Sequence, residues 1–128
     1  MPYKISWEER GVVLEYSGHA SDKDITAAVH AIEADERFDR LLYDVHDFRW
    51  CESVTFSQTT IEELAASDSI AARSLPRQQL AVAVVTDRQD VTAMVNAYLG
   101  SGFNLHEVRI FSKIEDARAW VSAFSKLQ

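Results

Sequence analysis

The sequence predicts an α/β protein with a mostly parallel five-stranded sheet, an antiparallel N-terminal edge strand and four helices, in the order ββαβαβαβα. After two strand-like stretches, apolar runs alternate strictly with amphipathic stretches, and right-handed crossovers turn such an alternation into a parallel sheet. The segment LAVAVVTD (80–87) begins with six apolar residues, which is typical of a central parallel strand covered on both faces. The 128 residues, 47% of them hydrophobic, suit a single domain spanning 1–128.

The N-terminal third predicts a hairpin and a helix. YKISWEE (3–9) alternates apolar and polar residues, and GVVLEYSG (11–18) follows after a turn, so the two stretches predict an antiparallel pair. Ser21 and Asp24 form a capping box for a helix over 22–35. Its apolar stripe consists of Ile25, Ala28, Val29 and Ile32.

The middle of the chain predicts a strand, a loop and a helix. RLLYDV (40–45) is a short apolar run typical of a buried strand, and a polar loop is expected over 46–57. A helix follows over about 57–72, with its start left open among four possible caps. These caps are Ser53, Thr55, Ser57 and Thr60, the last forming a capping box with Glu63.

The C-terminal part predicts two strands, each followed by a helix. After the strand at 80–87, Thr86 and Gln89 form a capping box for a helix that ends at Gly100. EVRIFS (107–112) predicts the last strand. The buried face of the final helix is expected to consist of Ala117, Trp120, Val121 and Phe124.

Composition and charge limit the possible partners and the cellular location. The formal net charge of −7 and the absence of a basic stripe argue against nucleic acid. No apolar run approaches the ~20 residues of a membrane-spanning helix. The N-terminal stretch lacks the apolar segment of a secretory signal, and one cysteine cannot form an internal disulfide, so we expect a cytoplasmic protein.

Four stretches of the chain carry a family resemblance: YSGHASDKDITAAVHAI (16–32), LLYDVHDF (41–48), LAVAVVTDR (80–88) and EVRIFSKIEDARAWV (107–121). Taken in this order, they resemble the SpoIIAA-like (STAS) family of anti-sigma factor antagonists, and more narrowly its bacterial subgroup of small uncharacterised proteins. The resemblance covers nearly the whole chain, and it implies a STAS-like fold.

The chain departs from the family at the serine that is phosphorylated in anti-sigma factor antagonists. Anti-sigma factor antagonists carry a phosphorylatable Ser in an Asp-Ser-Ser-Gly type signature at the start of the second helix, whereas this chain reads CESVTFSQTT (51–60). Ser53, Thr55 and Ser57 are the candidate phosphorylation sites, because helix N-termini favour anions. Plain N-capping is the alternative role of these hydroxyls.

Ligand sites in open parallel sheets lie beyond the carboxyl ends of the strands, where DVHDFRWCES (44–53) is expected. The candidate binding residues are Asp44, His46, Phe48, Trp50, Phe56 and Asp87. The three aromatic residues can anchor a partner, line a small-molecule cleft or fold back over the core. The acidic, His and Cys side chains lack zinc-ligand spacing, so we expect no metal and no other cofactor.

The expected function is a non-enzymatic regulatory or protein-interaction module that docks through the loop after the third strand and the second helix. Its partner is another protein or a second copy in a homodimer. The alternative is a carrier of a small apolar or lipid-like ligand, with a pocket lined by the loop aromatics. The third possibility, ranked last, is an enzyme that uses His46 or Cys51; the usual role of a free cysteine such as Cys51 is to fill a gap in the core.

Overall fold

The structure is a computed structural model and describes residues 2–126. The strands are β1 (Tyr3–Trp7), β2 (Gly11–Ser21), β3 (Tyr43–Thr55), β4 (Ala81–Val85) and β5 (Glu107–Phe111). The helices are α1 (Asp22–Glu33), α2 (Gln58–Ala71), α3 (Gln89–Leu99) and α4 (Ile114–Lys126), with short 3₁₀ turns at η1 (Glu36–Arg40) and η2 (Ala72–Ser74). The predicted order of elements is confirmed.

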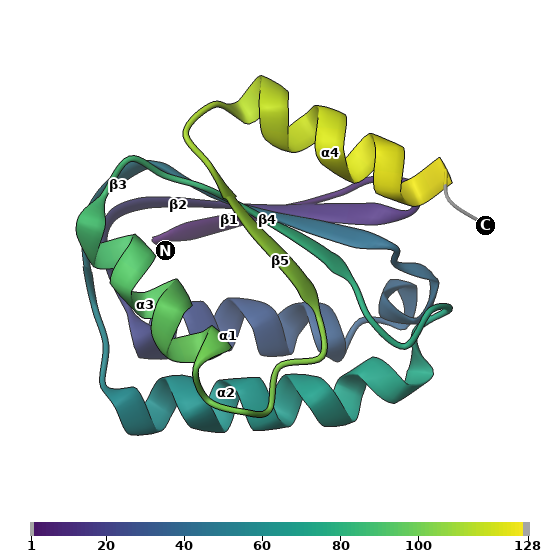
Figure 1. The fold of residues 1–128 in the computed structure, drawn as a ribbon, viewed down its shortest axis with the longest axis horizontal. Coiled ribbons are helices and arrows are strands. Elements are labelled where there is room, and N and C mark those ends of the chain that lie inside the picture. Colours follow the sequence, from purple (N-terminus) through teal and green to yellow (C-terminus); the bar gives the residue numbers. More distant parts are fainter. Residues whose placement is uncertain (1, 127–128) are drawn as a thin grey trace.

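The five strands form one sheet whose spatial order, β1-β2-β3-β4-β5, follows the chain. β1 pairs antiparallel with β2, and the other neighbours are parallel, as predicted. Right-handed crossovers that step in one direction place their helices on the same face of a sheet. Accordingly, α1, α2 and α3 cover one face, and α4 covers the other (Figure 1).

Strand alternation divides the core between these two faces. Toward α1–α3, β2 presents Val12, Leu14 and Tyr16, which belong to the larger buried cluster. The smaller cluster, toward α4, consists of Val13, Val45, Ala81, Ala83, Val85, Ala117 and Val121. The three-helix face is therefore the thick side of the molecule.

The prediction of a loop over 46–57 is wrong. β3 continues to Thr55, which pairs with Ser21 at the end of β2, so only Phe56 and Ser57 separate β3 from α2. Two register shifts in the β2–β3 pairing leave extra residues in β3. Such bulges break the period-two alternation by which a strand is recognised in a sequence. The long β2 supplies hydrogen-bonding partners for this polar segment.

The helix starts follow local side-chain capping. The Ser21 capping box is confirmed, with Asp24 N–H donating to Ser21 Oγ at 3.2 Å and Ser21 N–H donating to Asp24 Oδ2 at 2.9 Å. Ser57 caps α2 and accepts from Thr60 N–H at 3.2 Å. The predicted Thr86 capping box is wrong, because Arg88 occupies the N-cap position and Thr86 Oγ1 accepts from Arg88 N–H at 2.9 Å.

Candidate functional site

A cavity of about 90 Å³ lies between the sheet and helices α1–α3. Most of its wall is apolar, with contributions from Val29, Leu64, Val84 and Met94. Six polar side chains also line it, and they come from three helices, β3 and the segment before β5. These six are Glu33, Asp44, His46, Asp68, Tyr98 and His106. An apolar cavity with a few convergent polar groups is the usual form of a small-molecule site.

The β3 part of the cavity holds a chain of three hydrogen-bonded side chains. His46 Nδ1 lies 3.1 Å from the Tyr16 hydroxyl, and His46 Nε2 lies 3.2 Å from Asp44 Oδ2. The Tyr16 ring is stacked on Phe48, with 4.4 Å between the ring centroids, which fixes the hydroxyl. Burial lowers the pKa of His46, but the neighbouring Asp44 carboxylate more than offsets this and raises it above 6.5.

Asp44 is only 9% exposed, and its second carboxylate oxygen makes no hydrogen bond within the described residues. The first oxygen is occupied by His46. A buried acceptor without a donor is uncommon in folded proteins and needs an explanation.

The helices contribute a second polar group to the cavity. The Tyr98 hydroxyl of α3 donates to Asp68 Oδ2 of α2 at 2.6 Å. Burial raises the pKa of Glu33 in α1 to about 9, and the hydrogen bond with Asp68 adds to this rise. The pKa of Asp68 is also raised by burial, so the two carboxyl groups share a proton near neutral pH.

His106 supplies a hydrogen-bond donor to the cavity, whereas the carboxylates supply acceptors. Leu80 N–H donates to His106 Nδ1 at 2.9 Å, so the proton of the neutral ring is on Nε2. Burial lowers the pKa of His106 and keeps the ring neutral. The cavity wall therefore combines several carboxylate acceptors with one neutral N–H donor.

The predicted binding residues are only partly brought together. Asp44, His46 and Phe48 line the cavity. Trp50 is 59% exposed, Phe56 is half-buried against the core, and Asp87 lies exposed just after β4. The three aromatics do not gather at one place: Phe48 is buried in the core, Phe56 packs against it and Trp50 faces solvent. A regular strand would put Phe48 and Trp50 on the same face, but the register shift between Asp47 and Trp50 adds one residue to β3 and separates them.

The predicted phosphorylation sites occupy the end of β3 and the start of α2. Ser53 Oγ lies 2.6 Å from His19 Nδ1 across the β2–β3 pair, and Thr55 is the last residue of β3. Ser57 caps α2. The phosphorylation of these hydroxyls stays a prediction.

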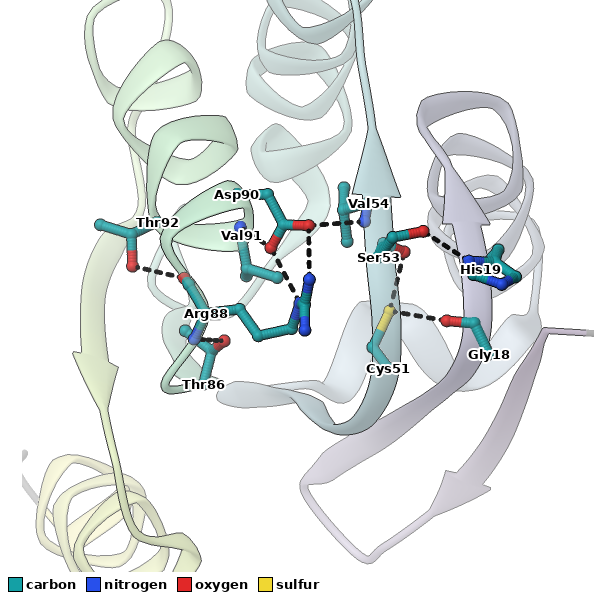
Figure 2. A network of polar contacts seen from close by, with 10 residues as sticks. All are labelled: Gly18, His19, Cys51, Ser53, Val54, Thr86, Arg88, Asp90, Val91 and Thr92. Carbon is teal, nitrogen blue, oxygen red and sulfur yellow. Dashed lines mark hydrogen bonds and ion pairs between the residues drawn. The ribbon is translucent and has the colours of Figure 1, made fainter.

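Cys51 lies apart from the cavity, in a polar network between β2, β3 and the start of α3 (Figure 2). Its thiol contacts the carbonyl oxygens of Gly18 at 3.3 Å and Ser53 at 3.2 Å. Burial raises the pKa of the Cys51 thiol, which disfavours the nucleophilic thiolate. Beside it, Arg88 pairs with Asp90, whose carboxylate accepts from Val54 N–H at 2.9 Å.

Sequence reasoning missed Glu33, Asp68, Tyr98 and His106. One signal was present for Asp68, since it follows Leu64 by four residues and so continues the inward stripe of α2. A charged residue at such a position is seldom buried without a partner. His106 carries no comparable signal, because its place in the cavity depends on long-range packing.

Within residues 2–126, no group of three His, Cys, Asp or Glu side chains is arranged to hold a metal ion. In the same range, no helix has the length and apolar character needed to cross a membrane.

The fold and the cavity define a small α/β protein in which three crossover helices enclose a polar cluster against a mixed sheet. The model of the SpoIIAA-like family matches residues 12–122, and the chain belongs to this family. Domains with this fold are commonly regulatory protein-interaction domains.

A solved structure supports the same fold. It is an uncharacterised protein of the DUF3478 family with a SpoIIAA-like fold, from Shewanella loihica PV-4. It shares 11% identity at a TM-score of 0.53, covering 93% of this chain and 91% of that chain. The search of curated proteins finds no match.

Proposed function

We propose that this protein is a non-enzymatic regulatory module that binds a small molecule in the cavity beneath α1–α3. The observation that carries this proposal is the buried, unpartnered oxygen of Asp44 at the wall of an otherwise apolar cavity. Leaving a buried acceptor unpaired costs about 1–3 kcal/mol. A bound molecule that donates to Asp44 would remove this cost.

The size of the cavity limits the size of the ligand that it can hold. A volume of about 90 Å³ is smaller than the apolar cavity of about 150 Å³ that is known to hold a benzene molecule. This suits a molecule of a few heavy atoms, or the head group of a larger one, better than a lipid chain.

The non-enzymatic part of the proposal rests on the two residues that sequence analysis singled out for catalysis. Both ring nitrogens of His46 are engaged, by Tyr16 and Asp44. The Cys51 thiol is held by two carbonyl oxygens and belongs to a different network. The hydroxyl beside His46 belongs to Tyr16, which is fully buried and whose pKa burial raises well above its usual value, so it is a poor nucleophile.

A cavity-filling variant tests the binding function. Native mass spectrometry of the purified protein is expected to detect a small adduct that Val84→Phe loses, because Val84 lines the cavity. Ile110→Phe is the matched control, since Ile110 is partly exposed on edge strand β5. An adduct retained by Val84→Phe with a native amide NMR spectrum would contradict binding in this cavity.

Protein docking is the second candidate function, and Trp50 is the observation that favours it. This side chain is 59% exposed on the part of β3 that extends beyond β4. Large exposed aromatics often anchor partners. We propose Trp50, together with the start of α2, as the docking surface for a second copy or another protein.

Sedimentation of wild type and Trp50→Ser over a range of concentrations tests self-association. A dimer that Trp50→Ser weakens supports docking through this surface. A monomer at all concentrations, or a dimer insensitive to the change, would exclude the homodimer through Trp50.

A further inference from the structure

We infer that the cavity ligand is a small organic cation, a primary alkylammonium group held between Asp44 and Asp68. This inference rests on the proposed binding function and specifies the chemical class of its ligand.

Two buried carboxylates offer one acceptor each. Asp44 and Asp68 are 9% and 7% exposed, and both line the cavity. On each residue Oδ2 is taken, by His46 in one case and by Tyr98 in the other. Oδ1 of Asp44 is buried and receives no hydrogen bond within the described residues. Oδ1 of Asp68 is buried as well, and the Asp68 carboxyl interacts with Glu33, so it becomes a full acceptor for a cation when the shared proton leaves.

The charges around the cavity favour a cation. Its described lining contains three carboxyl groups, from α1, β3 and α2, and neither Lys nor Arg. The histidines are His46, which already faces Asp44, and His106, which is kept neutral. A carboxylate or phosphate ligand would meet charges of its own sign in a poorly solvated site, whereas a cation would compensate them.

The arrangement of the acceptors favours an ammonium over a guanidinium or a metal ion. A guanidinium binds best to both oxygens of one carboxylate, but here each carboxylate has one oxygen already occupied. An ammonium has three separate N–H donors and can reach single oxygens on two carboxylates. The described residues provide no metal-ligand cluster. The apolar wall then accommodates a short alkyl chain.

Binding of an ammonium is linked to protons on the surrounding groups. Glu33 of α1 and Asp68 of α2 share a proton that the cation would displace, and His46 of β3 competes for Asp44 when it is protonated. Tyr98 of α3 and His106 before β5 complete the titratable lining and stay neutral. The affinity for an ammonium is therefore expected to increase from pH 6 to pH 9.

The test uses three probes of matched size: n-propylammonium, 1-propanol and propionate. Each is titrated into ¹⁵N-labelled protein at pH 8 and followed by amide chemical shifts. We expect saturable shifts around Asp44 and Asp68 with n-propylammonium, and at least tenfold weaker binding of the other two probes. Equal or tighter binding of propanol or propionate would overturn the inference.

Variants separate a site from a general attraction of cations to an acidic protein. Asp44→Asn and Asp68→Asn are each expected to weaken n-propylammonium binding at least tenfold. Asp87→Asn makes the same charge change on the surface and is expected to leave binding unchanged. If Asp44→Asn does not fold, Asp68→Asn carries the test. Equal weakening by Asp87→Asn would overturn the inference.

The ammonium inference and the binding function can fail separately. If no probe shifts a cavity resonance, the ammonium class is wrong. An adduct that Val84→Phe still removes would then leave the proposed binding function standing. If that adduct too is insensitive to Val84→Phe, both are wrong.

Discussion

The hydroxyl of Tyr98 donates a 2.6 Å hydrogen bond to Asp68, and this bond joins α3 to α2 across the cavity. Asp68 is only 7% exposed, so the bond offsets part of the cost of removing its carboxylate from water. The polar cluster is thus part of the packing of the three-helix face.

Tyr98→Phe is expected to lower the free energy of unfolding by about 1–3 kcal/mol, because it leaves a buried carboxylate oxygen without its donor. Urea unfolding measures this change. Tyr43→Phe is the control, since its partner Glu8 keeps two hydrogen bonds from Arg118 at 2.7 Å. Equal losses in the two variants would show that the Asp68 contact has no special role.

Glu33 is expected to make stability depend on pH. The folded state holds its proton up to about pH 9, whereas the unfolded chain releases it near 4.5. The stabilising contribution of Glu33 to the free energy of unfolding is therefore complete below pH 4.5 and decreases as the pH rises toward 9. In Glu33→Gln this decrease is expected to be smaller. Unfolding free energies measured from pH 5 to pH 9 test this, and an unchanged slope would contradict it.

Asp44→Asn is expected to lower the pKa of His46, because the carboxylate raises this pKa while burial lowers it. NMR titration of the imidazole protons measures the change. In the wild type, the raised pKa adds stability below pH 6.5 that is lost as the pH rises through the folded value. Asp87→Asn is the control, and a His46 pKa that stays the same in Asp44→Asn would contradict the assignment.

Cys51 is expected to react slowly with iodoacetamide at neutral pH until the protein unfolds. The thiol is buried, contacts two carbonyl oxygens and has a raised pKa. Mass spectrometry of labelling with and without urea compares the two rates. Fast labelling of the folded protein would indicate an activated thiol and would reopen the enzymatic alternative.

The repeating part of the fold was predictable from local patterns. The alternation of apolar runs with amphipathic stretches gave the element order, and the Ser21 capping box gave the start of α1. Both depend on neighbouring residues, so a single sequence contains them. The full length of β3 was not predictable in this way, because its bulges interrupt the alternation and its pairing partner β2 is distant in the chain.

The candidate site was predicted in part and for partly wrong reasons. Asp44 was expected near the end of a strand and His46 and Phe48 in the loop after it, but all three line the cavity from within β3. The other polar groups come from elements up to 73 residues apart, from Glu33 to His106. Their meeting depends on how three helices pack on the sheet, which no local pattern encodes.

The two faces of the sheet also differ in when they can be covered during synthesis. The three helices of one face lie between strands, so each can pack as soon as the strand after it has emerged from the ribosome. The other face stays uncovered until α4 has been synthesised, because α4 follows all five strands in the chain. Until then Val13, Val45 and Val85 have no helix over them. A nascent chain stalled before residue 114 would therefore expose an apolar, valine-rich surface that chaperones can bind.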